Sequence, residues 1–281
     1  MILVADSGAT KTDWCLINNG KCSPVFETLG LNPTYVSSPI ISDEIASAAK
    51  HFGNASAVEK VFFYGAGCAD EQKRNEMKSE LFRCFQNAEI EVYTDLFGAC
   101  RAVCGDKDGI VGILGTGSNS CVYKNGKIVE NIPSAGYMLG DEGSGTYIGK
   151  MLLKKYLTKR MPSDIEEKFS EFIGGLSRNE ILNIVYHQPQ PNKFFASLAP
   201  FAIKNRRYTY IYFHVEHCLD DFFTNQIRHY FEHDINDLYF VGSVAAKLEN
   251  QLKECAEKHG YTLRKVLQKP IKGLADFHIK K

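Results

Sequence analysis

The first twelve residues, M-I-L-V-A-D-S-G-A-T-K-T, constrain the fold of this chain more than any other stretch. Ile2 to Ala5 form a short apolar run with the length and branching of a buried strand, and the run stops at Asp6. Small residues follow from Ser7 to Thr10, and Gly8 lets the backbone bend and approach a ligand closely because it has no Cβ. The pattern predicts a strand, a glycine turn and a second strand.

The chemistry of this turn favours an anionic ligand. Thr10 and Thr12 offer hydroxyl groups, Lys11 offers a cation, and the backbone amides of such a turn can converge on an anion. Asp6 cannot itself bind a phosphate, so its natural role at a strand end is to hold Mg²⁺. We therefore interpret the stretch as a nucleotide-phosphate turn, although an ordinary β-hairpin has the same outline.

The middle of the chain repeats this arrangement. Gly109 to Leu114 predict a second buried strand, which is followed by the turn G-T-G-S-N-S at Gly115 to Ser120. The next residues, C-V-Y-K-N-G-K at Cys121 to Lys127, align without gaps with C-L-I-N-N-G-K at Cys15 to Lys21. The repeat predicts two related α/β lobes, each presenting a phosphate-binding loop toward a shared cleft.

A second aspartate also follows a predicted strand. Glu91 to Thr94 favour a strand, and Asp95 opens D-L-F-G-A-C-R-A-V, whose small residues suit a helix packed closely on a sheet. Two interpretations of Asp95 stay open at this point. It could cap the N-terminus of the helix, or it could act as a general base at the carboxyl end of a strand, where open α/β sheets bind their ligands.

Three further segments are candidates for ligand contacts. In G-L-N-P, Pro33 forces Asn32 into an extended conformation that would aim its amide, although a plain loop is the simpler interpretation. The glycine-rich stretch Ser134 to Gly149 carries Asp141, which lies either in a polar pocket or in a solvated turn. Gly242 and the small residues after it would allow a flat ring such as adenine to lie against the backbone.

Composition narrows the class of protein. The chain has 281 residues, of which 44% are hydrophobic and 23% charged, as is typical of globular domains. Lys+Arg and Asp+Glu both number 33, so no net field recruits nucleic acid or an anionic membrane, and no stretch is long and apolar enough to span a bilayer. We find no signal peptide, and nine scattered cysteines without a C-x-x-C pair predict reduced thiols in a cytoplasmic protein.

Two patterns resemble parts of metal sites. His229 to His233 match H-x-x-E-H, an inverted zinc-protease signature in which Glu232 would be the base. The pattern specifies no third ligand, and eight histidines in the chain are enough for a chance match. Cys100 and Cys104 lie at i and i+4 on a predicted helix, but two ligands do not make a zinc site. We predict core packing for these cysteines and no metalloprotease activity.

Five motifs in a fixed order resemble the superfamily of sugar kinases, heat-shock chaperones and actin. They are D-S-G-A-T-K-T, T-D-L-F-G-A, L-G-T-G-S-N-S, G-D-E-G-S-G and V-G-S-V-A-A. More closely, the chain resembles the BadF/BadG/BcrA/BcrD-type branch, which contains N-acetylglucosamine kinases. The resemblance implies an α/β fold of two ribonuclease-H-like (actin-like ATPase) lobes with a cleft between them. Residues 1–108 would form the lobe on the sugar and phosphate side, and residues 109–281 the nucleotide-side lobe with a helical insertion.

The resemblance also implies roles for individual residues. Asp95 would take the proton of the sugar hydroxyl, and Asp6 would hold Mg²⁺, directly or through water. The ATP-binding residues that it implies are Ser7, Gly8, Thr10, Lys11, Thr12, Gly115, Thr116, Gly117, Ser118, Gly242, Ser243 and Ala245. The sugar-binding residues that it implies are Asn32, Asp95, Gly136, Tyr137 and Asp141. Tyr137 stands where some N-acetylglucosamine kinases carry a tryptophan.

The expected activity is therefore ATP-dependent phosphorylation of an N-acetylated amino sugar, with N-acetylglucosamine 6-phosphate as the product. N-acetylmuramate and glucosamine are alternative acceptors. The same branch includes activator ATPases, which hold an iron–sulfur cluster between two subunits, and a sugar-responsive regulator could use the same fold. The cysteines do not cluster after the second phosphate loop, as an activator would require. The expected partners are a small sugar and a second copy of the chain, without nucleic acid or membrane.

Overall fold

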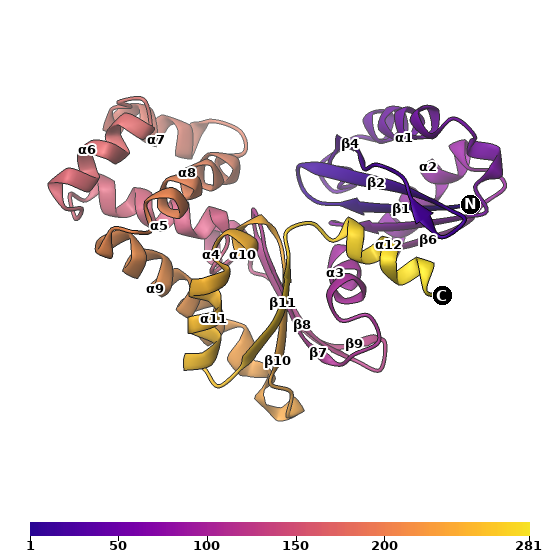
Figure 1. The fold of residues 1–281 in the computed structure, drawn as a ribbon. Coiled ribbons are helices and arrows are strands. Elements are labelled where there is room, and N and C mark those ends of the chain that lie inside the picture. The colour runs from indigo at the N-terminus through magenta and orange to yellow at the C-terminus, as the bar shows by residue number, and fades with distance from the viewer. The chain divides into compact units, whose positions relative to one another are not determined.

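The computed structural model describes residues 1–281, which form two compact units (Figure 1). The first unit comprises Met1–Lys107, Lys124–Ile128 and Lys269–Lys281, and the second comprises Asp108–Tyr123 and Val129–Gln268. Each unit is built on one β-sheet with helices packed against it, which confirms the predicted α/β class. None of the helices is long and apolar enough to cross a membrane.

The first unit contains a six-stranded sheet. Its elements are β1 (Ile2–Ser7), β2 (Lys11–Asn18), β3 (Lys21–Cys22), β4 (Phe26–Leu29), α1 (Ser38–Phe52), a 3-10 turn (Ala55–Ala57), β5 (Lys60–Gly65), α2 (Glu71–Cys84), β6 (Glu89–Thr94), α3 (Asp95–Val103) and α12 (Ile271–Ile279). The strand order is β3-β2-β1-β5-β6, and β4 pairs with β2. Because β1, β5 and β6 are parallel, their carboxyl ends meet at one edge of the sheet.

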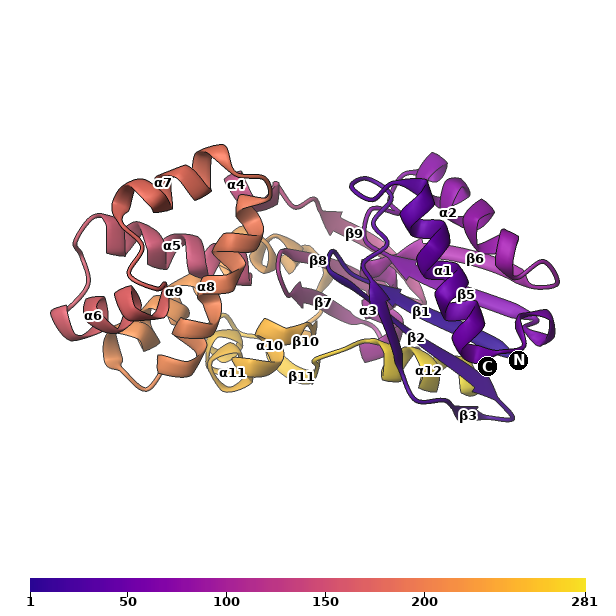
Figure 2. The same ribbon diagram turned by 90° about the horizontal axis from the view of Figure 1, so that it is seen from above.

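Helices cover both faces of this sheet. Figure 2 shows α1 and α2 together on one face, and Figure 1 shows α3 and α12 on the other. Alternate residues of the central strands, such as Leu3 and Ala5, point toward α1 and α2 as the period of a strand requires. They pack with Ile41 and Ile45, one turn apart on α1. This packing fixes the strand ends that carry the candidate site.

The second unit contains a five-stranded sheet in the order β11-β10-β7-β8-β9. Its elements are β7 (Gly109–Leu114), β8 (Ser118–Lys124), β9 (Lys127–Ile132), α4 (Gly136–Leu139), α5 (Gly145–Leu157), α6 (Ser163–Phe172), α7 (Arg178–His187), α8 (Pro191–Asn205), α9 (Thr209–Asn225), a 3-10 helix (Ile227–His233), β10 (Asp237–Val241), α10 (Ser243–Lys247), α11 (Glu249–Lys258) and β11 (Thr262–Leu267). The helices from α4 to α9 lie in sequence between β9 and β10.

The two sheets share one topology. In the first, the antiparallel β1–β2 hairpin is followed by the parallel strands β5 and β6. In the second, the antiparallel β7–β8 hairpin is followed by the parallel strands β10 and β11. The orders β2-β1-β5-β6 and β8-β7-β10-β11 therefore correspond strand by strand. The internal repeat that the sequence predicts is present in the structure.

The last thirteen residues belong to the first unit, although the sequence analysis assigned all of 109–281 to the second. Helix α12 packs against α3, and a Cβ on Gly273 would lie 2.5 Å from Ala102 O. His278 Nε2 also lies 2.8 Å from the hydroxyl group of Tyr64 in β5. The correction has a simple cause. These contacts join residues far apart in sequence, so no local pattern predicts them.

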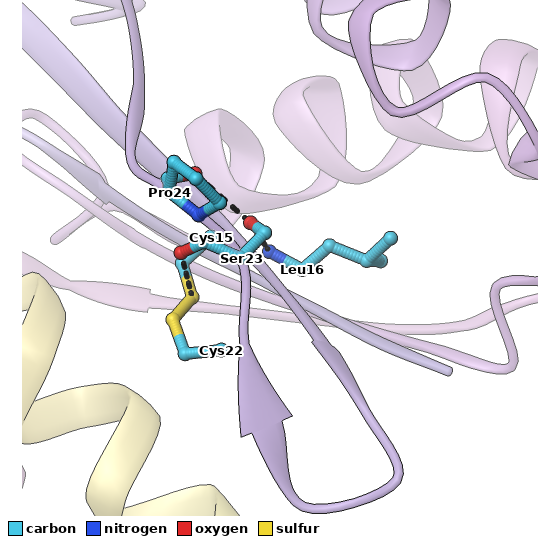
Figure 3. The surroundings of a disulfide bond; sticks show 5 residues. All are labelled: Cys15, Leu16, Cys22, Ser23 and Pro24. Carbon is cyan, nitrogen blue, oxygen red and sulfur yellow. Dashed lines mark hydrogen bonds between the residues drawn. A yellow bond between two sulfur atoms is a disulfide. The ribbon is translucent and has the colours of Figure 1, made fainter.

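Two of the nine cysteines form a disulfide, which corrects the prediction that all are reduced. Cys15 in β2 and Cys22 in β3 are joined with a Cα–Cα distance of 6.2 Å (Figure 3). Ser23 closes the same hairpin, because its Oγ accepts from Leu16 N at 3.0 Å and donates to Pro24 O at 2.9 Å. The turn between two short strands brings together cysteines seven residues apart, a spacing that has no fixed motif.

Gly149 tests the close packing of α5 against α8. A Cβ at this position would lie 1.9 Å from Phe195 O. Gly to Ala in a helix interior normally stabilises by about 0.5–1 kcal/mol, whereas overpacking costs about 1–3 kcal/mol. We expect Gly149→Ala to lower the free energy of unfolding, measured by urea denaturation. Lys154→Ala, at an exposed position of α5, is the control and should change it by at most about 0.5 kcal/mol. A more stable Gly149→Ala variant would contradict the packing.

Candidate functional site

The β1–β2 hairpin holds the first predicted phosphate turn. Asp6 pairs with Asp13 across the two strands. Gly8 N donates to Lys11 O at 2.9 Å, which closes the turn. The chain after β4 approaches so closely that a Cβ on Gly30 would lie 2.5 Å from Gly8 O. Backbone on both sides therefore fixes the position of the turn.

The hydroxyl groups of Ser7 and Thr12 point into the unit, whereas we expected them to face a phosphate. Both residues are fully buried, and their hydroxyl oxygens lie 2.8 Å apart. Thr12 Oγ1 donates to Leu29 O at 2.8 Å, and Ser7 Oγ accepts from Leu31 N at 2.9 Å. If Ser7 donates to Thr12, each hydroxyl has a donor and an acceptor partner. These groups stabilise the turn, and the side chains of Thr10 and Lys11 remain exposed.

Three carboxylates gather where β1 and β6 end. Burial raises the pKa of Asp6 to about 8; the negative charges of Asp95 and Asp13 add to the rise, and Lys269 opposes it. Burial also raises the pKa of Asp95, while the hydrogen bond from Leu96 N at 2.9 Å works against the rise. Carboxylate oxygens are the ligands that Mg²⁺ prefers. A cluster with excess negative charge therefore fits a divalent cation.

Asp95 is not the N-cap of α3. That position belongs to Thr94, whose Oγ1 accepts from Phe97 N at 3.1 Å. Asp95 is instead the first residue of the helix, and its Oδ1 accepts from the next amide, Leu96 N. The capping interpretation is therefore wrong. A shielded carboxylate at the carboxyl end of a parallel strand is where an open α/β sheet binds its ligand.

Two lysines flank the first turn. Lys11 Nζ lies 2.5 Å from Glu27 Oε1, and Lys269 Nζ lies 3.2 Å from Glu27 Oε2. Lys269 Nζ also lies 2.9 Å from Asp13 Oδ1. Lys11 and Glu27 are both exposed, so their ion pair adds little stability. Lys11 can therefore exchange Glu27 for a phosphate, whereas Lys269 is tied to the buried Asp13.

The sequence analysis did not single out Asp13 or Lys269. Asp13 had a usable signal, because a hairpin centred on the glycine turn pairs it directly with Asp6. Lys269 had none. It lies 256 residues from Asp13, and only the return of the chain to the first unit brings the two together.

Asn32 is held rigidly in the first unit. It is buried, and its Oδ1 accepts from Thr34 N at 2.9 Å, an Asx turn that the sequence analysis did not foresee. A Cβ on Gly67 would lie 2.1 Å from the same oxygen, so only glycine fits beside it. Asn32 Nδ2 donates to no protein group. The amide is thus fixed through its oxygen, and its nitrogen is left as a hydrogen-bond donor.

The second predicted phosphate turn lies between β7 and β8. Gly115 N donates to Gly117 O at 3.0 Å. The first turn of α5 holds the carbonyl groups: Gly145 N donates to Gly115 O at 2.9 Å, and Thr146 Oγ1 donates to Thr116 O at 2.7 Å. Thr116 N and Gly117 N donate to no protein group. The turn is therefore fixed through its oxygens, while two adjacent amides are left for an anion.

Asp141 contacts the second turn. Its Oδ1 accepts from Ser134 Oγ at 2.6 Å and weakly from Ser118 N at 3.4 Å. A Cβ on Gly117 would lie 3.0 Å from Asp141 Oδ2. The backbone φ of Asp141 is 57°, a value that residues other than glycine rarely adopt. Asp141 therefore makes polar contacts with the second turn at a half-exposed position.

Gly136 and Tyr137 begin α4. The ring of Tyr137 packs against the core of the second unit, and its carbonyl oxygen accepts from Lys150 Nζ at 2.6 Å. Burial lowers the pKa of Lys150, and the charges of Asp141 and Glu142 oppose the shift. The sequence analysis missed Lys150, a partly buried cation close to Asp141.

Gly242 brings the predicted adenosine motif against the second turn. Its φ is 126°, and a Cβ would lie 2.2 Å from Leu114 O, at the end of β7. Ser243 begins α10 and is exposed, whereas Ala245 is buried. The predicted single helix up to about residue 259 is in fact two helices, α10 and α11, which meet at Leu248.

The H-x-x-E-H pattern does not build a zinc-protease site. Residues 227–233 form a 3-10 helix, in which residues three apart are aligned, so His229 and His233 do not share a face. His233 Nε2 lies 2.5 Å from Glu130 Oε2. Tyr230 between the histidines is buried, and its hydroxyl group lies 2.9 Å from Ser120 Oγ. The segment packs against the sheet, as predicted for a chance match.

Comparisons with known proteins show strong similarity over the whole chain. A model of the BadF/BadG/BcrA/BcrD ATPase family matches residues 5–210. The crystal structure of a proposed N-acetylglucosamine kinase from Porphyromonas gingivalis has 38% identity and a TM-score of 0.94, over 100% of this chain and 99% of that chain. A search of curated proteins found no match.

Two other structures share the fold at lower identity. A proposed N-acetylglucosamine kinase from Chromobacterium violaceum is 19% identical with a TM-score of 0.70, over 98% of both chains. A ROK family glucokinase from Streptomyces griseus, solved in complex with glucose and AMPPNP, is 15% identical with a TM-score of 0.57, over 98% of this chain and 97% of that one. These two likenesses concern the fold alone.

The raised pKa of Asp6 predicts a pH-dependent stability. The folded state keeps a proton on Asp6 up to about pH 8, whereas the unfolded state releases it near pH 3.8, so this group lowers stability as pH rises through that window. Without divalent metal, the melting temperature of Asp6→Asn minus that of the wild type should increase as the pH rises from 5 to about 8. Asp43→Asn, at an exposed position of α1, is the control. A constant difference across this range would contradict the shift.

Proposed function

The chain belongs to the BadF/BadG/BcrA/BcrD ATPase family, and we propose that it transfers the γ-phosphoryl group of ATP to an N-acetylated amino sugar. The preferred acceptor is N-acetylglucosamine, with the 6-phosphate as product. The class of acceptor is inferred from the similarity to the proposed N-acetylglucosamine kinase of Porphyromonas gingivalis, which is 38% identical. The observation that carries the proposal is the position of Asp95, a shielded carboxylate at the carboxyl end of β6 and beside Asp6.

Asp95 is the general base in this proposal. Its carboxylate accepts the proton of the sugar hydroxyl as that oxygen bonds to the γ-phosphorus and ADP leaves. The raised pKa of Asp95 makes it a better proton acceptor than an exposed carboxylate, and the bond from Leu96 N holds one oxygen in place. Asn32 Nδ2 is the fixed donor to the sugar. Catalysis would rest mostly on positioning and charge neutralisation.

Asp6 holds Mg²⁺ in this proposal, directly or through water. The bound ion would neutralise charge on the phosphate oxygens of ATP. Asp13 belongs to the same carboxylate cluster, and Lys269 limits its negative charge. The amides of the first turn, with Thr10 and Lys11, contact the phosphates. Ser7 and Thr12 support this turn from inside the unit.

The second unit binds the nucleotide in this proposal. The two amides of Thr116 and Gly117 donate to phosphate oxygens, and Gly242 with Ser243 and Ala245 lies along the adenosine. We assign Asp141 to the second turn rather than to the sugar, since its carboxylate contacts Ser134 and Ser118 N. Gly136 and Tyr137, on the helix that Lys150 contacts, remain the sugar-side candidates.

Asp95→Asn tests the assignment of the base. The variant keeps the shape of the side chain but cannot accept the proton, so turnover should fall by about 10²–10⁴. The affinity for ATP, measured without Mg²⁺ by titration calorimetry, should stay within about twofold of the wild type, because Asp95 is assigned to the sugar hydroxyl and not to the nucleotide. Asp276→Asn, at an exposed position of α12, is the control. Near-normal turnover in Asp95→Asn would remove Asp95 from this role.

A panel of acceptors tests the substrate. ADP release with Mg-ATP is measured with N-acetylglucosamine, N-acetylmuramate, N-acetylmannosamine, glucosamine, glucose and no sugar. We expect stimulation by N-acetylglucosamine that is lost in Asp95→Asn. Preference for N-acetylmuramate or glucosamine would keep the kinase and change its acceptor. A flat response with slow hydrolysis would overturn the kinase and favour an activator ATPase, whereas sugar binding without turnover would favour a regulator.

A further inference from the structure

Three side chains of different chemistry converge in the second unit, and none of them is assigned to ATP or sugar. Asp220 comes from α9, Cys255 from α11, and His259 follows the last turn of α11. One ligand atom of each lies within 4.8 Å of the other two. His259 Nε2 and Asp220 Oδ1 are only 2.7 Å apart. A thiol, an imidazole and a carboxyl group thus face one point.

The helices explain why these residues meet. Cys255 and His259 are four residues apart, so a helix places them on one face. Helix α9 packs alongside α11 and presents Asp220 to that face. The ring of His259 is held by stacking on Phe223, with ring centroids 5.1 Å apart. Cys255 is buried and Asp220 is exposed, so the group opens to solvent on one side.

We propose that Asp220, Cys255 and His259 bind one divalent transition metal ion of the zinc class, with water as the fourth ligand. Thiolate, imidazole and carboxylate are all zinc ligands, whereas Mg²⁺ and Ca²⁺ take oxygen ligands. Tetrahedral bonds of about 2.0 Å to nitrogen or oxygen and 2.3 Å to sulfur put ligand atoms about 3.3–3.6 Å apart. Side-chain shifts of about 1 Å would close the present group on such an ion.

Two carboxylates place negative charge near this point. Asp220 and Glu216, one turn apart on α9, act on the Cys255 thiol, and the ammonium group of Lys258 offsets part of their charge. Lys258 forms an ion pair with Glu216, which leaves Asp220 as the carboxylate that faces His259. On binding, Cys255 coordinates as the thiolate and releases its proton to solvent. The ion would join α9 to α11 and so stabilise the second unit.

Cobalt(II) titration of the full chain, freed of metal, tests the site. We expect a thiolate-to-cobalt charge-transfer band and tetrahedral visible bands that saturate at one equivalent and disappear when Zn²⁺ is added. Cys255→Ser should abolish the charge-transfer band. Asp220→Asn, at an exposed position that tolerates substitution, should weaken Co²⁺ binding at least about tenfold. Zn²⁺ should also raise the melting temperature of the wild type and not of Cys255→Ser.

Matched controls separate this site from other thiols and from catalysis. Cys84→Ser removes a half-buried cysteine of the first unit and should leave the cobalt spectrum unchanged. Sugar phosphorylation with Mg-ATP should be unchanged in Asp220→Asn. Because the cobalt titration measures metal binding and not activity, a failure of the proposed kinase function would not affect this test. The proposal would be overturned if no cobalt bands appear. It would also be overturned if the charge-transfer band persists in Cys255→Ser, or if Asp220→Asn binds Co²⁺ as tightly as the wild type.

Discussion

The geometry of the first unit depends on two hydroxyl groups that contact no solvent. Ser7 and Thr12 hydrogen-bond to each other and to the backbone at the end of β4 and just after it, so the glycine turn and the loop carrying Asn32 are held together. Gly30 allows this contact because no Cβ separates the two backbones. Replacing such buried hydrogen bonds with water would leave the turn free to move. The turn is therefore positioned before any ligand arrives.

The negative charge of the carboxylates in the same region is only partly compensated. Asp6, Asp13 and Asp95 lie close together, and Lys269 is the cation that acts on them. Burial and mutual repulsion make full ionisation of the cluster unfavourable, so a proton takes the place that a divalent cation could fill. The second turn, in the second unit, has the opposite polarity. Its amide groups are left as donors, because the first turn of α5 hydrogen-bonds to its carbonyl groups. The carboxylate cluster of the first unit therefore suits a cation, and the second turn suits an anion.

The pattern of residues within short stretches of the sequence predicted those features of the fold that depend on neighbouring residues. The strand–turn–strand repeats, the α/β class and the position of Asp95 after a strand all follow from short stretches of sequence. The orientation of the Ser7 and Thr12 hydroxyl groups did not follow, because their backbone partners, at the end of β4 and just after it, lie 17 and 24 residues away in the sequence. The partnership of Lys269 with Asp13 and the docking of α12 are set by tertiary contacts. The same holds for the Cys15–Cys22 disulfide, which the hairpin register creates.

The membership of residues 269–281 in the first unit determines the order in which the chain can fold during synthesis. Residues 108–268 emerge from the ribosome before α12, and at about 5–20 residues per second this takes roughly ten to thirty seconds. During that interval, α3 and the ring of Tyr64 lack the helix that covers them. The unit made first is therefore completed last, and its uncovered apolar face is the surface that a nascent-chain chaperone would meet.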